Sequence, residues 1–472
     1  WGERENTPFH FRPMEMVLAL GGNMKLRTEP LAKNIDWIGY DDLDGRPAFQ
    51  MAMQKANGHY YLYTASWRHN GWTILDVTNP AAPRKVRWVQ GPWFFDGVRD
   101  GQNTCKIQVA DGLMITAHGT MASFLTGCDP DLPAWCGMMV WDVQTDPENP
   151  RLLSQFECPG GQGVHRSFYS GGRYAYITGC CEGYESFILR IIDLQDPTHP
   201  VESSRWCVPE QIISTQSHTK FGEHLLRPFV HAVTVKDDIA YLAYANVGMV
   251  MLDVKDKSNP RFIGKVPLNP PFSRGASGAP VHSAFPLGDR PYVVVSTEGE
   301  RSRFFDGKKT CGFGSRIKTQ AMNMIGIIEV TEPENPNLIS VFPYPEVPEG
   351  YTHGSNFNYV EGVRVPFGPH NCFDAFGTDV YKKLNNKVLN CYFHAGLRIF
   401  DVSDPFCPRE DAYFLPPDPP KMLTDNRTHD VMPGTPIAIT EDVLVDDRGY
   451  IYISTQQDGV YILKYTGADG LS

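Results

Sequence analysis

The chain has 472 residues, of which 42% are hydrophobic and 12% aromatic, enough to bury a sizeable core. Its formal net charge is −11 and its basic residues form no cluster, which argues against nucleic acid and anionic membrane surfaces as partners. No apolar run reaches the roughly 18–20 residues of a membrane-spanning helix, so no membrane insertion is expected.

The first 32 residues lie outside any repeat. Their apolar side chains suggest an arm docked on the rest of the protein rather than a free tail: Phe9, Phe11, Met14, Met16 and Leu18. Residues 34–40 follow as a predicted strand. We therefore expect two parts, an N-terminal arm over residues 1–32 and one domain over residues 33–472.

The cysteines and the first residue both bear on the cellular location of the protein. The 11 cysteines cannot all pair and show no zinc-like paired CxxC spacing, which favours a reducing, cytoplasmic location, although Cys128 and Cys136 could bridge one loop. Because the chain begins at Trp1, we keep a periplasmic or cell-surface location as the alternative, reached if a signal peptide preceded it.

A strand followed by a proline turn recurs along the chain. Copies begin at Leu75, Trp141, Ile192, Leu252, Ile328 and Phe400, and a degenerate seventh copy spans residues 460–467. The same position holds an acid in each of the six regular copies: Asp76, Asp142, Asp193, Asp253, Glu329 and Asp401. The prolines stop further strand pairing, and the turns divide the chain into units.

The clearest unit spans residues 227–268. Alternating apolar residues predict strands on both sides of a tight turn at residues 236–238, a third strand begins at Gly248, and RFIGKV makes a fourth. Four antiparallel strands in about forty residues have the size of one propeller blade.

This pattern resembles the LVIVD-repeat family of bacterial β-propellers over nearly the whole chain after about residue 33. The resemblance implies an all-β fold, a seven-bladed β-propeller of four-stranded antiparallel blades. The last blade, residues 442–465, lacks a fourth strand, and residues 34–40 look like an outer strand. We expect this N-terminal strand to complete the last blade and close the ring.

Long insertions fall on two kinds of connection. They join second strands to third strands (residues 117–137, 179–187 and 298–324) or one blade to the next (residues 90–104, 206–230, 342–369 and 415–440), whereas the turns between first and second strands stay short. Both kinds of long connection emerge on one face of the ring, so this face is expected to hold the site.

Histidine recurs at the head of the innermost strand. Aligned on this strand, the seven blades present Gln50, Cys105, His165, His231, His282, His370 and, nearest in the last blade, Glu441. Four imidazoles converging on one axis make a site for a transition metal. Iron(II) is preferred, with copper or zinc as alternatives; the competing interpretation is that these histidines only hydrogen-bond neighbouring loops.

Seven blades with four axial histidines are geometrically similar to the carotenoid cleavage oxygenases, whose iron(II) is held in this way, and to the copper methanethiol oxidases related to selenium-binding protein. There is no extended sequence match to either, so no substrate carries over.

Further candidates lie where second strands end, beside the heads of the first strands. Glu298 flanks His282 and could accept the N–H of a ligating imidazole. His118, His394 and Glu441 could act as acid–base groups or extra ligands, although each could equally be a loop residue. Other residues could line the opening of the central channel on this face. They are His353 and His429, with the aromatic residues Trp67, Trp93, Phe94, Phe95 and Phe124.

These features favour a mononuclear metal-dependent oxidoreductase or oxygenase acting on a small organic molecule, with aromatic molecules among the candidate substrates. The alternative from another class is a metal-free binding propeller at the cell surface. A metal-assisted lyase or hydrolase using the same histidines is a third hypothesis. The sequence carries no signal for the oligomeric state.

Overall fold

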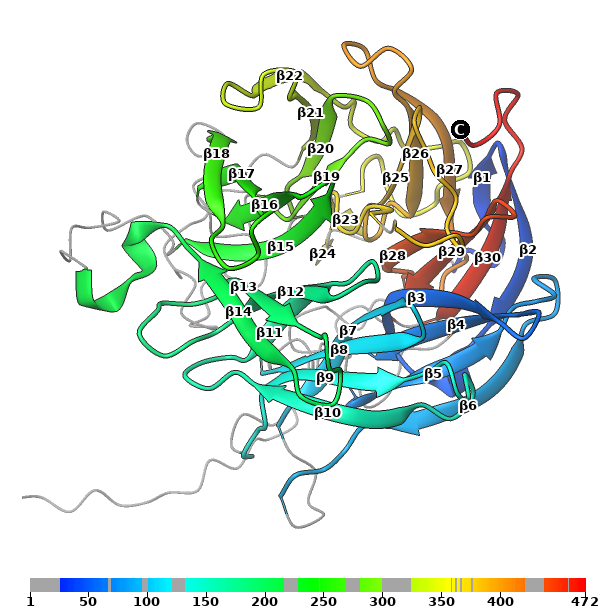
Figure 1. The fold of residues 1–472 in the computed structure, drawn as a ribbon. Coiled ribbons are helices and arrows are strands. Elements are labelled where there is room, and N and C mark those ends of the chain that lie inside the picture. The colour runs from blue at the N-terminus through cyan, green and yellow to red at the C-terminus, as the bar shows by residue number, and fades with distance from the viewer. Residues whose placement is uncertain are drawn as a thin grey trace, which may run out of the picture.

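The computed structural model describes residues 26–66, 69–95, 101–120, 132–215, 228–245, 247–268, 281–298, 324–357, 359–360, 363–365, 367–374, 377–420, 437–456 and 458–472. Seven four-stranded antiparallel blades surround a central axis (Figure 1), which confirms the predicted fold. The described residues include three short 3₁₀ helices: η2 (Leu43–Gly45), η3 (Pro209–Gln211) and η4 (Ile213–Thr215). Across the described ranges, no helix has the length and apolar character needed to cross a membrane.

The first four blades each use four consecutive strands. They are β3 (Ala48–Ala56), β4 (His59–Ser66), β5 (Gly71–Asp76) and β6 (Arg84–Gln90); β7 (Asn103–Ala110), β8 (Leu113–Gly119), β9 (Gly137–Asp142) and β10 (Arg151–Glu157); β11 (Val164–Phe168), β12 (Tyr174–Gly179), β13 (Ile188–Asp193) and β14 (Val201–Trp206); and β15 (Phe229–Lys236), β16 (Ile239–Ala245), β17 (Gly248–Asp253) and β18 (Arg261–Val266).

The fifth blade also uses consecutive strands, whereas the sixth and seventh each include a strand from the start of the described chain. They are β19 (Ser283–Pro286), β20 (Tyr292–Ser296), β21 (Ile325–Glu329) and β22 (Asn337–Val341); β25 (Lys387–Cys391), β26 (Leu397–Asp401), β27 (Arg409–Leu415) and β1 (Leu31–Lys33); and β28 (Thr440–Val445), β29 (Tyr450–Thr455), β30 (Gly459–Tyr465) and β2 (Ile35–Asp41). A hairpin of β23 (Tyr359–Val360) and β24 (Val363–Arg364) lies in the connection between the fifth and sixth blades.

The core lies between neighbouring blades. The middle strands are buried on both faces, whereas fourth strands such as β18 alternate between buried and exposed residues. Ile191 of the third blade packs in one cluster with Leu242 and Val250 of the fourth. Burying each such side chain contributes about 1.5–3 kcal/mol, so the stacking of blades is the main source of stability.

The ring is closed by the N-terminal strand, as predicted. β2 pairs antiparallel with β30, from Ile35 opposite Tyr465 to Asp41 opposite Val460. The Trp37 ring lies 5.4 Å from that of Tyr461. This pairing joins the two ends of the described chain and covers the edge that β30 would otherwise expose.

The start of the described chain also pairs with the sixth blade, which the sequence did not predict. β1 lies against β27, so the expected boundary after residue 32 falls inside a strand. The Arg27 amide donates to the Asp418 carboxylate at 2.7 Å, and its guanidinium donates to the Pro416 carbonyl at 2.7 Å. The five apolar residues proposed to dock the arm lie outside the described residues.

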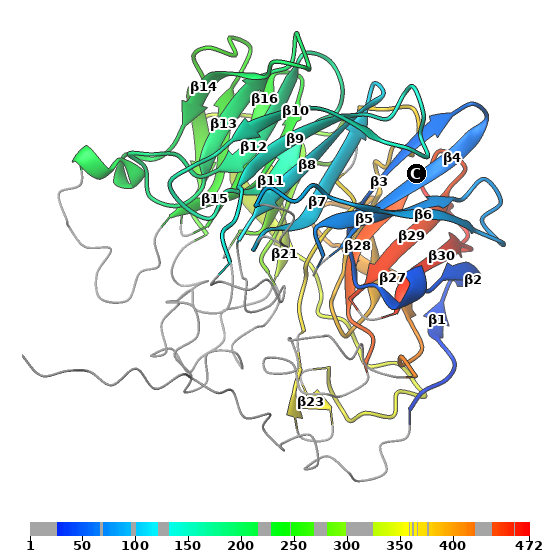
Figure 2. The same cartoon turned by 90° about the horizontal axis from the view of Figure 1, so that it is seen from below.

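The sixth blade departs from the prediction at its inner edge. Residues 370–374 form no regular strand, although a bridge from Cys372 to Asn390 and backbone hydrogen bonds to β25 mark where a first strand was expected. The connection from Phe373 to Lys387 is long, so the expectation of short turns between first and second strands is wrong in this blade. Elsewhere the strand bounds place the long connections where they were predicted. β23 belongs to one of them and is set off from one face of the ring (Figure 2).

The repeated acid is a turn residue. Asp76 accepts a hydrogen bond from the Thr78 amide at 3.0 Å, and Asp142, Asp193 and Asp401 accept from the amide two residues later in the same way. This side chain therefore replaces a backbone acceptor and fixes the turn that ends each third strand.

In several turns the carbonyl of the first proline also contacts the preceding blade. Ser154 and Ser340 each donate a 2.6 Å hydrogen bond to the carbonyl of the turn proline in the next blade, Pro197 and Pro405. At the closure, Gly39 occupies the equivalent place, and a Cβ there would lie 2.0 Å from the Pro80 carbonyl oxygen. The repeat thus sets the angle between neighbouring blades.

We expect Gly39→Val to destabilise the ring at its closure, because the added side chain would collide with the Pro80 backbone. Backbone atoms cannot move aside as the end of a flexible side chain can. The expected loss in the free energy of unfolding is about 1–3 kcal/mol, measured by chemical denaturation. Gly179→Ala is the control, since its Cβ would meet no atom nearer than 3.5 Å. Equal stability of the two variants would contradict this account of closure.

Candidate functional site

A β-bulge lies at the head of the inner strand in most blades, at the position aligned with the histidines. The pairing register shifts between Val164 and Arg166, between Val230 and Ala232, and between Thr440 and Asp442. The first and second blades shift at the same place, next to Gln50 and Cys105. A bulge leaves its extra residue outside the ladder and re-aims its side chain. Two consecutive residues of one strand can therefore point toward the axis.

The four predicted histidines converge at this level. Ring centroids of successive pairs are 4.5 Å apart for His165 and His231, 4.1 Å for His231 and His282, and 4.7 Å for His282 and His370. The structure thus brings together four side chains spread over roughly two hundred residues. His165 is half-buried and the other three are buried, so the cluster is open to solvent on the His165 side.

Hydrogen-bond partners fix the tautomers of three of these rings. The Nδ1 atoms of His231 and His370 lie 2.8 and 2.9 Å from the backbone carbonyls of His282 and Glu441, which only accept, so each Nδ1 carries the proton. His282 Nε2 faces a guanidinium N–H of Arg166 at 3.3 Å, so it is an acceptor too. All three rings therefore have an unprotonated Nε2.

Part of this donor set has the spacing of ligands to a transition metal. The Nε2 atoms of His165 and His231 are 2.8 Å apart. Two nitrogens bound at right angles to one ion, each at about 2.0–2.1 Å, would be separated by about 2.9 Å. Ligand atoms of His231, His282 and Glu298 also lie within 4.8 Å of one another. The structure therefore places Glu298, a half-buried residue, beside the histidines it was predicted to accompany.

Glu441 is placed to orient His370. Its Oε2 lies 3.0 Å from His370 Nδ1, and its Oε1 accepts a hydrogen bond from Gln456. Both carboxylate and amide are buried. A carboxylate on the far nitrogen of an imidazole fixes its orientation and raises its basicity, which is the outer-shell role that the sequence suggested for Glu298.

His118 and His394 are not brought to the cluster by any described contact. Both nitrogens of His118 lie near threonine hydroxyls, Nδ1 3.2 Å from Thr104 and Nε2 2.7 Å from Thr116. His394 Nε2 lies 2.6 Å from the Tyr351 hydroxyl. Burial lowers the pKa of each histidine to about 3. Both rings are neutral at pH 7, and the contacts of His118 are those of a core residue.

The other residues predicted at the opening of the channel differ in their surroundings. His353 is buried against Asp418 at 2.7 Å, and Phe94 stacks on Trp135, where it borders the blade core. Trp93 and Phe95 are half-buried. Trp67, Phe124, His429 and Cys128 lie outside the described residues. An aromatic wall that the sequence did not single out borders the imidazoles instead: Phe393 stacks on His370 at 4.6 Å, and Phe187 lies 5.7 Å from His165.

A second layer of axial residues was missed. It is formed by the residue that follows the aligned position in each blade, and its polar members are Lys106, Arg166, Ser283, Asn371 and Asp442. Arg166 of the third blade reaches His282 of the fifth and Asn371 of the sixth, which is only possible across the axis. Period-two alternation would turn these residues away from the axis. The available signal was two consecutive polar residues at the head of an inner strand.

Burial and positive neighbours keep the imidazoles neutral. Desolvation is the main cause that lowers the pKa of His231 well below its usual value, followed by repulsion from His165 and Arg166. The pKa of His282 is lowered in the same way by burial, His231 and Arg166. Neutral imidazoles are the form that binds metals.

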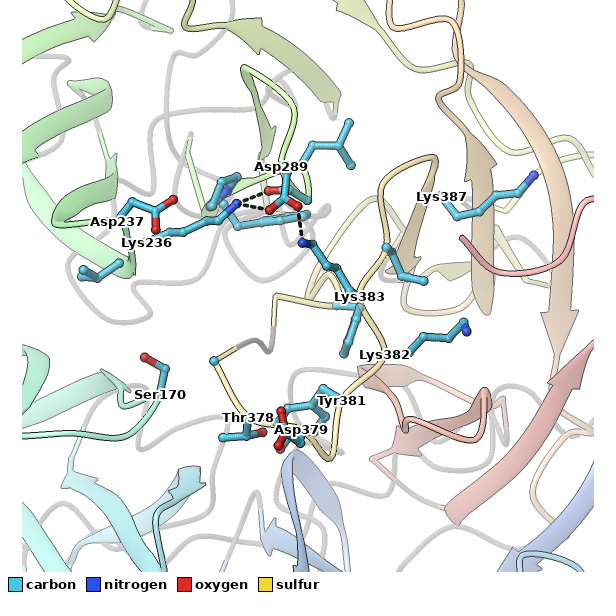
Figure 3. A pocket seen from close by; sticks show the side chains of 18 residues that line it. Ser170, Lys236, Asp237, Asp289, Thr378, Asp379, Tyr381, Lys382, Lys383 and Lys387 are labelled. Atoms are coloured by element: carbon cyan, nitrogen blue, oxygen red, sulfur yellow. Dashed lines mark hydrogen bonds and ion pairs between the residues drawn. The ribbon is translucent and has the colours of Figure 1, made fainter.

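One pocket of about 620 Å³ lies at the opposite end of the inner strands. Lys236 ends β15, about 16 Å along the strand from His231 at about 3.3 Å per residue. Lys236 and Lys383 both point at Asp289, whereas Lys382 and Lys387 point away (Figure 3). Because its charges are paired in this way and none of the four histidines lines it, we do not place the chemistry there.

Comparisons with known proteins agree with the fold. The family model for the LVIVD repeat matches residues 58–89 and 230–267. A hypothetical selenium-binding protein from Sulfolobus tokodaii is similar at 12% identity and a TM-score of 0.49, over 87% of this chain and 84% of that one. The β-propeller domain of Cps50 from Myceliophteria thermophila is similar at 8% identity and a TM-score of 0.49, over 89% and 99%. A search of curated proteins finds no match. These similarities carry no information on activity.

We expect buried His118 to make stability depend on pH. Its pKa is about 3 in the folded protein and about 6.5 when unfolded, so below pH 6.5 only the unfolded chain binds this proton. The stability it supports is complete above pH 6.5 and decreases toward pH 3, by up to about 1.4 kcal/mol per pH unit. In denaturation measured from pH 7 to pH 4, His118→Asn should have a shallower slope than wild type.

The control for this prediction is His199→Asn, because His199 is 81% exposed at its side chain. Its slope should match that of wild type. An unchanged slope in His118→Asn would show that the folded protein protonates His118 readily.

Proposed function

We propose that this chain, which belongs to the LVIVD-repeat β-propeller family, is a mononuclear metal-dependent oxidoreductase whose metal is held by His165, His231, His282 and His370. The observation that carries the proposal is the convergence of four imidazoles, three of them with Nε2 unprotonated. Iron(II) is preferred and copper is second, since imidazole ligands suit both; a structural zinc would normally be closed by four ligands.

The bound metal would supply redox chemistry with dioxygen or the substrate, and the protein would supply position and surroundings. Glu441 holds His370 in its ligating orientation through Nδ1. Glu298 is half-buried and lies near His231 and His282, where it can accept or return a proton. Phe187 and Phe393 exclude water around the rings and favour a small organic substrate with an apolar or aromatic part.

A metal-free binding propeller is the second candidate, and one observation favours it. The imidazoles also form a hydrogen-bonded series without an ion, in which His165 meets His231 Nε2 and the Arg166 guanidinium donates to His282 Nε2. A buried cation beside a metal opposes metal binding unless an anion lies between them. A metal-assisted lyase or hydrolase is separated from the oxidoreductase by testing whether turnover needs dioxygen.

We expect purified protein to contain about one iron or copper ion per chain by elemental analysis, and His231→Ala to contain less than about one tenth of that. His231 contributes one nitrogen of the close pair and lies at the centre of the cluster. His199→Ala, a change on the surface, is the control and should keep its metal. Protein prepared under anaerobic conditions without metal, or metal retained fully in His231→Ala, would favour the binding propeller.

We expect Glu441→Gln to weaken metal affinity by about 10–100-fold while the fold remains intact, because the neutral amide orients His370 less firmly than the carboxylate. Competition with a chromophoric chelator measures this affinity. Glu298→Gln is the informative comparison. An equal loss there would assign a ligand or orienting role to Glu298, whereas unchanged affinity with slower turnover would assign it to proton transfer.

A further inference from the structure

We propose that Arg166 and Asn371 form an anion site beside the four histidines, which takes the carboxylate of a small organic acid. Arg166 reaches across the axis from the third blade, and Asn371 follows His370. The inference deepens the proposed function, since it names the class of substrate for the same site, but the anion site itself can be tested without a metal.

The first argument is the unmet hydrogen-bonding capacity of Arg166. Its side chain is 5% exposed, and its Nη2 donates to His282 Nε2 at 3.3 Å and to Asn371 Oδ1. Its Nε has no acceptor in the described part of the chain. A guanidinium has five N–H donors, and a buried donor left unsatisfied costs about 1–3 kcal/mol. An incoming oxygen acceptor would remove this cost.

Asn371 offers a second donor at the same place. Its Oδ1 accepts from the guanidinium, so the amide orientation is fixed, because the guanidinium cannot accept. Its Nδ2 is then a buried donor with no acceptor among the described residues. Two buried donors without acceptors, on side chains bonded to each other, match a ligand with two acceptor oxygens.

The charge balance of the layer favours an anion. No ion pair of Arg166 is found in the described ranges, in contrast to the buried Arg190 and Arg398, which pair with Glu202 and Glu410. Asp374 and Asp442 lie near Arg166, but burial raises the pKa of both, that of Asp442 to about 7. At pH 7 the Asp442 carboxyl is therefore only partly ionised and does not fully balance the charge of Arg166.

The same ligand resolves a conflict in the proposed metal site. A metal bound to His282 Nε2 would take the acceptor that Arg166 uses now and would place a second cation near the guanidinium. A carboxylate between them satisfies both. A monoanion suits one unpaired guanidinium, and its organic part would lie toward Phe187 on the open side of the cluster.

The test is calorimetric titration with benzoate, and with formate as the smallest carboxylate, on chelator-treated and on metal-loaded protein. We expect benzoate to bind wild type, and Arg166→Met to bind it about 10–100-fold more weakly in both forms. Asn371→Ala should lose a smaller part of the affinity, and Arg166→Lys should keep more than Arg166→Met. Folding of each variant is checked by its thermal unfolding midpoint.

Lys383→Met is the matched control, because Lys383 is a cation at the distant pocket. Benzoate affinity unchanged in Lys383→Met supports the Arg166 site, whereas loss in that variant would overturn it in favour of the lysine pocket. Equal binding to wild type and Arg166→Met would also overturn it. If benzoate binding depends on Arg166 but the protein never takes up metal, the anion site is supported and only the metalloenzyme proposal is contradicted.

Discussion

The bulge at the head of the inner strand in most blades is the constraint on which the candidate site depends. In a regular strand, successive side chains point to opposite faces, so a blade would present only one of two neighbouring residues to the axis. The shift between Val164 and Arg166 releases both His165 and Arg166 toward it. Repeated around the ring, this one irregularity produces a layer of imidazoles and, next to it, a layer of charged and amide side chains.

The bulges would not bring residues together without a fixed angle between blades. That angle depends on the turn in each repeat. An acid such as Asp76 ties the turn to its own strand, and the following proline carbonyl receives Ser154, Ser340 or Gly39 of the blade before it. The pairing of β2 with β30 then removes the last free edge. The repeated turn that identifies the family in the sequence is therefore also the element that positions the inner strands around the axis.

The parts of the structure that follow a period were predictable from the sequence. The blades, the closing strand at Ile35 and the four axial histidines all repeat, so one clear unit predicts the others. Arg166 could not be placed because a bulge breaks alternation without a signature of its own, and Asn371 could not because its segment forms no regular strand. The turn to the second strand of the sixth blade was also misjudged, since its inner strand is irregular around Cys372. The role of Glu441 depends on a contact with His370 that no local pattern encodes.

The imidazole layer can bind a cation, whereas the neighbouring layer already contains one. This difference limits which ligands the site can bind. Neutral, desolvated imidazoles such as His231 are ready to bind a cation, while Arg166 beside them is a cation already. Either the ring stays a hydrogen-bonded structural core, or a metal enters together with an anion that pairs with the guanidinium. Because a buried guanidinium without a carboxylate partner is costly, a ligand that supplied the missing charge would stabilise the protein. Metal binding and anion binding should then be coupled, each raising the affinity for the other.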